Sequence, residues 1–115
     1  MQIEERKVGA VTILDVTGKL VLGDGDAQLK DKVHSLVNQG CKQVILNLGG
    51  VPYIDSAGIG EIVRTHTTMS SGGGSLKLLN VTKRIHDLLV ITKLVTIFET
   101  FDSEAEALRS FSATV

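Results

Sequence analysis

The chain has 115 residues, of which 43% are hydrophobic, and a formal net charge of −1 at pH 7. This length suits a single domain over residues 1–115 with one hydrophobic core, and the mixed charge provides neither a basic face for nucleic acid nor a cationic helix for a membrane. No apolar run approaches the roughly 20 residues that cross a bilayer, and residues 1–7 carry charges that do not fit a secretion signal, so we expect a cytoplasmic protein.

The thiol and imidazole side chains do not form a motif. Cys41 is the only cysteine, which excludes an internal disulfide, and His34, His66 and His86 are far apart in the sequence without a second ligand nearby. We therefore expect neither a metal nor a cofactor, and we interpret these four residues as structural or surface positions.

The first elements are predicted to be strands. Residues 2–7 and 11–17 are rich in Val, Ile and Thr and are separated by Gly9 and Ala10, a pattern that predicts a β-hairpin. Residues 19–22 predict a brief third strand.

A helix and a buried strand are predicted next. Four apolar residues recur at the spacing of one helix face: Leu29, Val33, Leu36 and Val37. Either Asp24 or Asp26 is expected to cap this helix, and Gly40 is expected to end it. Residues 44–48 then form a nearly unbroken apolar run, which predicts a central strand buried on both faces.

The second half alternates helices with strands. A helix is expected to begin near Ser56, with apolar spacing that continues to His66, and residues 70–74 are expected to end it as a flexible connector. The rest of the chain predicts, in order, a strand, a helix, a strand and a short helix: residues 75–81, 82–94, 95–101 and 102–112. Such alternation predicts an α/β fold with a largely parallel sheet joined to the hairpin.

The segment VPYIDSAGIGEIV, residues 51–63, places Ser56 where an apolar strand gives way to a helix. Gly58 and Gly60 fall in the first turn of that helix, where each glycine costs about 1 kcal/mol relative to alanine. Functional groups gather at such junctions in parallel α/β sheets. Two structural interpretations compete with a functional one: Asp55 and Ser56 only cap the helix, or a glycine lets the helix pack closely on the sheet.

A catalytic role for Ser56 is disfavoured. A hydrolase nucleophile elbow reads G-x-S-x-G, whereas Ile54 lies two residues before Ser56, and no histidine is adjacent in the sequence. We therefore predict that the chain is not an enzyme. A small serine bordered by glycines suits a substrate on which another protein's active site closes. Phosphorylation would add about 1.5 to 2 negative charges beside Asp55 and would repel a bound partner.

Four segments together resemble the STAS-domain family, and specifically its stand-alone bacterial anti-sigma factor antagonists (anti-anti-sigma factors): VPYIDSAGIGEIV, the preceding VILNL, GKL after the second strand, and LKLLNVTKRIHDLL. The resemblance covers essentially the whole chain, and D-S-x-G-[IL]-G after an apolar strand is similar to the family's phosphorylation motif. It implies a STAS-like α/β fold with a mixed, largely parallel sheet, an N-terminal hairpin and about four helices mainly on one face.

The resemblance also implies partner switching in transcription regulation. The unphosphorylated protein binds an anti-sigma factor, typically a serine kinase that holds the nucleotide itself, and thereby frees a sigma factor. The kinase phosphorylates Ser56, which switches binding off, and a serine phosphatase acting on phosphorylated Ser56 reverses the change. The residues that the resemblance assigns to the partner surface are Asp55, Ala57, Gly58, Ile59 and Gly60.

The chain departs from the family pattern in the loop before the first helix. Shorter members have an acidic residue directly after the G-x-L turn, whereas Val21 and Leu22 precede Asp24 here. The resemblance places this loop, residues 22–26, near Ser56 and within the partner surface, with Asp24 as a contact residue, and helix capping is the alternative role for Asp24 and Asp26.

Two other functions are weighed against the switch. Within the same fold, the domain would be a scaffold subunit of a larger signalling assembly or of a lipid-transport complex. From another class, it would be a small serine hydrolase or a nucleotide-binding enzyme that uses Ser56. A monomer or weak dimer is expected for the switch, and a large stable assembly for the scaffold.

Overall fold

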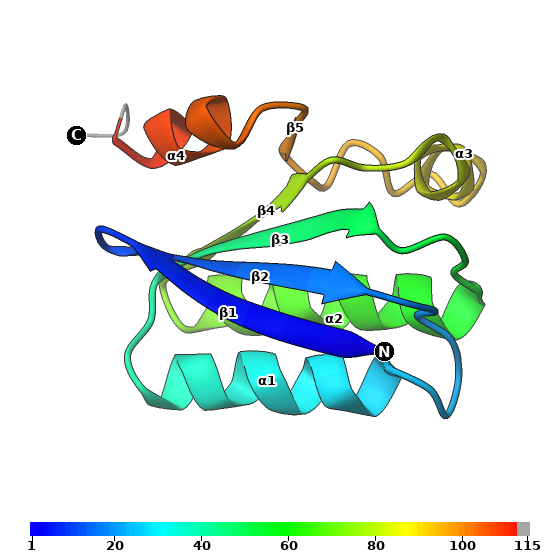
Figure 1. Cartoon of the computed structure of the whole chain (residues 1–115), viewed down its shortest axis with the longest axis horizontal. Coiled ribbons are helices and arrows are strands. Elements are labelled where there is room, and N and C mark those ends of the chain that lie inside the picture. The colour runs from blue at the N-terminus through cyan, green and yellow to red at the C-terminus, as the bar shows by residue number, and fades with distance from the viewer. Residues whose placement is uncertain (113–115) are drawn as a thin grey trace.

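In the described part of the chain, five strands form one sheet in the order β1-β2-β3-β4-β5, which is also their order along the chain (Figure 1). The computed structural model describes residues 1–112. β1 pairs antiparallel with β2, and each later strand is parallel to its neighbour. The bounds of the strands are Gln2–Val8 (β1), Val11–Thr17 (β2), Gln43–Gly50 (β3), Ser75–Leu79 (β4) and Thr100–Phe101 (β5).

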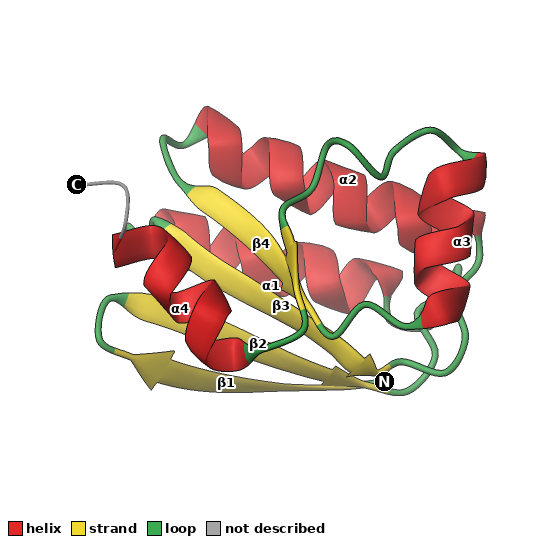
Figure 2. Cartoon of the chain, turned by 90° about the horizontal axis from the view of Figure 1, so that it is seen from above, coloured by secondary structure: helices red, strands yellow, loops and turns green. Residues whose placement is uncertain are grey.

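Within residues 1–112, four helices connect or follow the parallel strands. α1 and α2 cover one face of the sheet, α4 lies on the opposite face, and α3 lies at the end of the molecule where β2 and β3 finish (Figures 1 and 2). The bounds of the helices are Asp26–Asn38 (α1), Ser56–Ser71 (α2), Lys83–Ile91 (α3) and Glu104–Ser112 (α4). The predicted mixed, largely parallel sheet with an N-terminal hairpin is confirmed.

The main core lies between the sheet and the α1–α2 layer. β3 is the middle strand, and its four apolar residues, Val44, Ile45, Leu46 and Leu48, are all completely buried, as the apolar run predicts. On α1, Leu29, Val33 and Leu36 are buried, which confirms the predicted apolar face. α3 adds Ile85 and Leu89 to this cluster.

A second, smaller core lies under α4. Because side chains alternate between the faces of a strand, Ile45 points to this side whereas Val44 and Leu46 point to the main core. The buried residues of the second cluster are Val11, Ile13, Ile45, Leu79, Ala107 and Phe111. Three helices therefore pack on the main cluster and one on the other.

One predicted strand does not form and another is shorter than expected. Residues 19–22 do not form a strand and make only isolated bridges, one of them between Leu20 and Ile54. Residues 95–101 pair with β4 only at Thr100–Phe101. The reason is that the segment after α3 turns back on itself, where the Ile97 amide bonds to the Leu94 carbonyl, and buries Phe98 in the main core.

The predicted capping of α1 by an aspartate is wrong. The residue at the N-cap is Gly25, with φ of 99°, and it makes no side-chain capping bond. A left-handed φ of this size favours glycine over aspartate, which explains the choice. Asp26 is instead the first helical residue, and its carboxylate accepts the amides of Gly23 and Ala27. Asp24 lies on the turn before it.

The starts of α3 and α4 are close to the predicted positions, but α3 ends at Ile91 and not at residue 94, because Lys93 has a left-handed φ of 61°. Thr82 caps α3 by accepting the Ile85 amide, so the helix itself begins one residue later than residues 82–94 predict. Ser103 accepts the amide of Glu106 at the start of α4, where the sequence predicts a short helix over residues 102–112.

Candidate functional site

Ser56 is the first residue of α2 and lies at the carboxyl end of the parallel strands (Figure 1). Its side chain is exposed, and it makes no hydrogen bond to another side chain or backbone group of the described residues. The preceding Ile54 is buried and anchors the β3–α2 loop in the main core. The hydroxyl is therefore accessible and free while the backbone that carries it is fixed.

Asp55 is the N-cap of α2. Its carboxylate accepts the amide of Gly58 at 2.9 Å and the amide of Leu22, on the β2–α1 loop, at 3.1 Å. These bonds, the one from Gly58 first, lower the pKa of the Asp55 carboxyl below its usual range. Asp55 therefore carries a negative charge next to the Ser56 hydroxyl at neutral pH, and it joins two loops. The predicted capping by Asp55 is confirmed.

The two loops around Ser56 run side by side. The Leu20 amide donates to the Tyr53 carbonyl at 3.0 Å, and the Asp55 amide donates to the Leu20 carbonyl at 3.4 Å. The Leu20 and Ile54 side chains are both buried beneath this pairing. The pairing is possible because the β2–α1 and β3–α2 loops leave adjacent parallel strands at the same edge of the sheet.

Gly58 is required by close packing. A Cβ atom on Gly58 would overlap the carbonyl oxygen of Leu20 and would lie 2.6 Å from Cγ1 of Ile54. A Cβ atom on Gly60 would meet only the side chain of Arg64, at 3.4 Å. The interpretation that a glycine allows close packing therefore holds for Gly58. It does not apply to Gly60.

The predicted site residues differ in their exposure. Asp55, Ala57 and Gly60 are partly exposed around Ser56, whereas Gly58 is buried and Ile59 is 5% exposed. Gly58 and Ile59 are therefore not part of the exposed surface and pack beneath it, on the side of the core. Asp24 is exposed on the neighbouring β2–α1 loop.

Three further residues border the site: Leu22 belongs to the loop, residues 22–26, that the resemblance places near Ser56, whereas Tyr53 and Arg84 are absent from the sequence prediction. Leu22 and Tyr53 are exposed beside Asp55, and the guanidinium carbon of Arg84 lies 4.5 Å from the centroid of the Tyr53 ring. In the sequence, Leu22 is the last residue of the segment 19–22 that predicts a brief strand, and a loop of Gly and Asp follows it directly. No local pattern connects Arg84 with Tyr53, because these residues are distant in the sequence.

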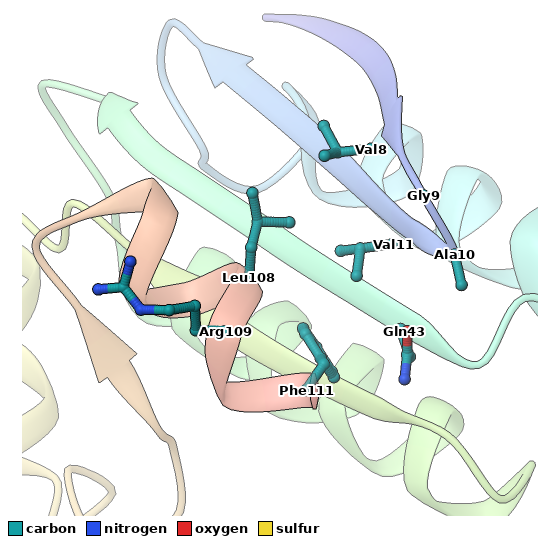
Figure 3. A pocket seen from close by; sticks show the side chains of 8 residues that line it. All are labelled: Val8, Gly9, Ala10, Val11, Gln43, Leu108, Arg109 and Phe111. Atoms are coloured by element: carbon teal, nitrogen blue, oxygen red, sulfur yellow. The ribbon is translucent and has the colours of Figure 1, made fainter. Parts of the chain in front are cut away.

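A separate pocket lies at the other end of the sheet (Figure 3). It is bordered by the hairpin turn, the first residues of β2 and β3, and α4; its lining residues are Val8, Gly9, Ala10, Val11, Gln43, Leu108, Arg109 and Phe111. Because Ser56 follows the opposite end of β3, this pocket is not part of the Ser56 site.

The histidines lie in structural or surface positions. His66 packs edge-on against Phe98 with 5.1 Å between ring centroids, and His34 and His86 are exposed on α1 and α3. Within residues 1–112, no group of three or more His, Cys, Asp or Glu side chains is placed to hold a metal ion. No helix in this part of the chain has the length and apolar character to cross a membrane.

Within residues 1–112 the chain is a small α/β domain with an exposed serine at a fixed helix start, next to an ionised carboxylate. The model of the STAS domain matches residues 2–107, and the chain belongs to this family. Anti-sigma factor antagonists with this domain are regulatory binding proteins and not enzymes, in agreement with the predicted absence of catalysis by Ser56.

Individual relatives agree with this assignment. The anti-sigma F factor antagonist of Paenibacillus polymyxa is 26% identical over 108 residues, which cover 94% of this chain and 92% of that protein. The anti-sigma-B factor antagonist of Bacillus subtilis is 39% identical over 71 residues, 62% of this chain and 64% of that protein. The crystal structure of TM1081 from Thermotoga maritima superposes with a TM-score of 0.86 at 27% identity, covering 94% of this chain and 92% of that chain.

Proposed function

We propose that the protein is a bacterial, cytoplasmic anti-sigma factor antagonist controlled by phosphorylation of Ser56. The unphosphorylated form binds an anti-sigma factor that is a serine kinase and thereby frees a sigma factor. Phosphorylation of Ser56 by this kinase ends the binding, and a serine phosphatase restores it. The observation that carries the proposal is the exposed, unbonded hydroxyl of Ser56 at the start of α2, next to the ionised Asp55.

The electrostatics of the site support a switch. A phosphoserine carries about 1.5 to 2 negative charges near neutral pH. The amino end of a helix would normally favour such an anion, but here Asp55 already accepts the amide of Gly58. The new charge would therefore lie beside an existing one. A like-charge contact in an interface costs several kcal/mol, and each 1.4 kcal/mol is tenfold in affinity, so one phosphate is sufficient.

The shape of the surface supports contact with a kinase. In the first turn of α2 after Ser56, the partly exposed residues are Ala57 and Gly60, which have little or no side chain. Such a surface lets an active site approach the hydroxyl closely. Gly58 and Ile59, which are buried, would maintain the backbone beneath it, and Asp24 would contact the partner from the neighbouring loop.

Binding of a purified anti-sigma factor kinase to variants at Ser56 tests the proposal. By isothermal titration calorimetry, Ser56→Ala should bind as tightly as the wild type, and kinase with ATP should not phosphorylate it. Ser56→Asp should bind at least about tenfold more weakly. Ser71→Asp, an equal charge change at an exposed serine at the far end of α2, is the control and should bind normally.

Two outcomes would contradict the proposal. Equal affinity of Ser56→Asp and the wild type would show that charge at this position does not control binding. Phosphorylation of the Ser56→Ala variant to the same extent as the wild type would place the modification elsewhere. Elution of the isolated chain as a large stable assembly in size-exclusion chromatography would favour a scaffold, whereas a monomer or weak dimer fits the switch.

A further inference from the structure

β1 is an edge strand with one long side open. Among the described residues it pairs only with β2, and it forms the outer border of the sheet (Figure 2). It spans seven residues, Gln2–Val8, and every one of them has a partner in β2. The unpaired N–H and C=O groups along such an edge are a template on which a further strand can add.

The hairpin turn determines which backbone groups of β1 point outward. Gly9 and Ala10 form a two-residue turn, and Val8 and Val11 are the pair that closes it. The residues that close such a turn exchange both hydrogen bonds, and bonded pairs then recur at every second residue. The even-numbered residues of β1 therefore bond to β2. Three residues direct their N–H and C=O groups to the open side: Ile3, Glu5 and Lys7.

The side chains of β1 alternate between the two faces of the sheet. Glu5 lies on the α1 side, where its carboxylate is 2.8 Å from Lys32 Nζ, and Ile3 packs on the main core of the same side. Arg6 lies on the α4 side, where it pairs with Glu104. The residues with outward-pointing backbone groups thus all have side chains on the α1 side, and a strand added here must follow the same alternation.

The segment QIEERKV is complementary to a second copy of itself. When two β1 strands run antiparallel around a two-fold axis perpendicular to the sheet, odd-numbered residues must face odd-numbered residues. The register centred on Glu5 is the one that pairs the whole strand, residues 2–8. On each side of the axis it places Glu4 opposite Arg6 of the second copy, and directly opposed charges of unlike sign stabilise a strand pair.

The like-charge pair in this register lies on the axis, where the two Glu5 carboxylates face each other. Each of them is bonded to Lys32 of its own α1, and this hydrogen bond is the main cause of the lowered pKa of Glu5. Lys7 of the second copy lies diagonally across from Glu5 on the same face. A shift by two residues would pair only residues 2–6 or 4–8, with two Glu4 or two Arg6 side chains on the axis.

We propose that β1 is a self-association surface, on which a second copy of this chain adds its own β1 antiparallel in the register centred on Glu5. The sheets of the two copies then form one continuous sheet. Charges on an edge strand oppose pairing with unrelated strands, whereas Glu4 and Arg6 suit the same residues in a second copy. The inference does not depend on the proposed function, and Ser56 stays free because it follows β3, away from this edge.

The size of the contact determines what should form. One strand of seven residues on each copy is a small interface, so we expect a dimer in equilibrium with the monomer. A two-fold contact uses the same edge of both copies and leaves no second β1 edge open, so association should stop at two copies.

Sedimentation equilibrium over a series of protein concentrations tests the inference. Glu5→Pro removes an N–H that points to the open side and keeps the bonds to β2, and it should raise the Kd of the dimer at least about tenfold. Glu5→Ala is the matched control. It loses the same carboxylate and the same bond to Lys32 but keeps the N–H, so it should dimerise at least as tightly as the wild type.

Oxidative crosslinking of introduced thiols tests the register and needs no proline. In a Cys41→Ser background, Glu5→Cys should form a disulfide between copies, because a hydrogen-bonded pair has Cα atoms about 5.5 Å apart, within the range of a disulfide. Lys7→Cys is the control on the same face of β1. The two position-7 residues lie about 14 Å apart along the strands, so this variant should stay uncrosslinked. A mixture of Ile3→Cys and Lys7→Cys chains should crosslink.

Three results would overturn the inference: a wild type that stays monomeric at every concentration, equal dimerisation of Glu5→Pro and Glu5→Ala, or crosslinking of Lys7→Cys with itself as fast as that of Glu5→Cys. A cooperative thermal transition of each variant shows that it is folded. Because no kinase is present in these experiments, their outcome is separate from the binding of Ser56→Asp, which tests the proposed function.

Discussion

The carbonyl oxygen of Leu20 occupies the space that a Cβ atom on Gly58 would need. This contact joins the start of α2 to the β2–α1 loop, and it explains why a helix accepts glycine in its first turn. It also fixes the backbone on either side of Asp55, because the same carbonyl accepts the Asp55 amide.

Replacement of Gly58 should therefore destabilise the protein. In Gly58→Ala, the new methyl group would overlap the backbone carbonyl of Leu20, which cannot move away as a flexible side chain would. We therefore expect the free energy of unfolding to fall by about 1 to 3 kcal/mol. Gly60→Ala is the matched control, because Gly60 lies two residues further along α2 and has only the Arg64 side chain nearby. It should be neutral or stabilising by up to about 1 kcal/mol. Urea denaturation measures both, and a Gly58→Ala variant as stable as Gly60→Ala would refute the packing explanation.

Loss of the Asp55 carboxylate should weaken the start of α2 and release Leu22. Asp55→Ala removes both acceptors of the Gly58 and Leu22 amides, whereas Asp55→Asn keeps one oxygen that can accept one of the two amides. We expect a lower urea midpoint for Asp55→Ala than for Asp55→Asn, and faster amide hydrogen exchange at Leu22. Asp31→Ala, at an exposed position of α1, should leave both measurements unchanged.

Acid should remove the advantage that Asp55 gives to the folded state. The pKa of this carboxyl is lowered in the folded protein, so its contribution is present above the ordinary carboxyl pKa of about 4 and is lost as pH falls through the lower, folded value. The difference in urea midpoint between the wild type and Asp55→Ala should be larger at pH 7 than at pH 2.5. An unchanged difference would mean that the charge on Asp55 does not contribute.

Arg6 should control the titration of Asp15 on the α4 side of the sheet. Arg6 Nε lies 2.5 Å from Asp15 Oδ2, and Arg6 Nη2 lies 2.7 Å from Glu104 Oε1 on α4, while Asn47 donates to Asp15 at 2.8 Å. Chiefly because of the Arg6 hydrogen bond, the pKa of Asp15 is lowered. In Arg6→Gln, the pKa of Asp15 should rise toward its ordinary value, as NMR titration of the carboxyl carbon would show.

The same variant should change the acid dependence of stability. Because the folded pKa of Asp15 is depressed, Arg6 and Asp15 stabilise the wild type above about pH 4, and this contribution declines as pH falls through the folded value. The wild type should therefore exceed Arg6→Gln in urea midpoint at pH 7, and the two should converge at low pH. Parallel pH profiles would contradict this account.

Lys77 should tolerate an apolar replacement better than truncation. It is 4% exposed in β4, its Nζ donates to Ser110 Oγ on α4 at 2.8 Å, and the same atom lies 4.3 Å from the centroid of the Phe111 ring. Lys77→Ala leaves a cavity under α4 and should cost about 2 kcal/mol or more. Lys77→Met fills most of the space, and Ser110 keeps its bond to the Ala107 carbonyl, so the loss should stay below about 1 kcal/mol in urea denaturation.

Much of the fold follows from the spacing of side chains along the chain. The apolar run of residues 44–48 specifies a strand buried on both faces, because neither face can be left in water. Helical spacing from Leu29 to Leu36 specifies the buried face of α1. The position of Asp55 and Ser56 at the start of a helix also follows from the local sequence, because the Asp55 carboxylate accepts the amide of a residue only three positions further on. These features depend on neighbours in sequence, so the sequence alone determines them.

Other features were decided only by tertiary structure, because they depend on residues that are distant in the chain. The bond from Leu22 to Asp55 and the bond from Lys77 to Ser110 each join residues 33 positions apart. Gly58 is glycine because the Leu20 carbonyl passes over it, a contact that no local pattern records. The chain after α3 forms a strand of only two residues because Phe98 is needed in the main core. Burial and close approach arise when separate segments meet, and that decides which of several locally acceptable conformations the chain adopts.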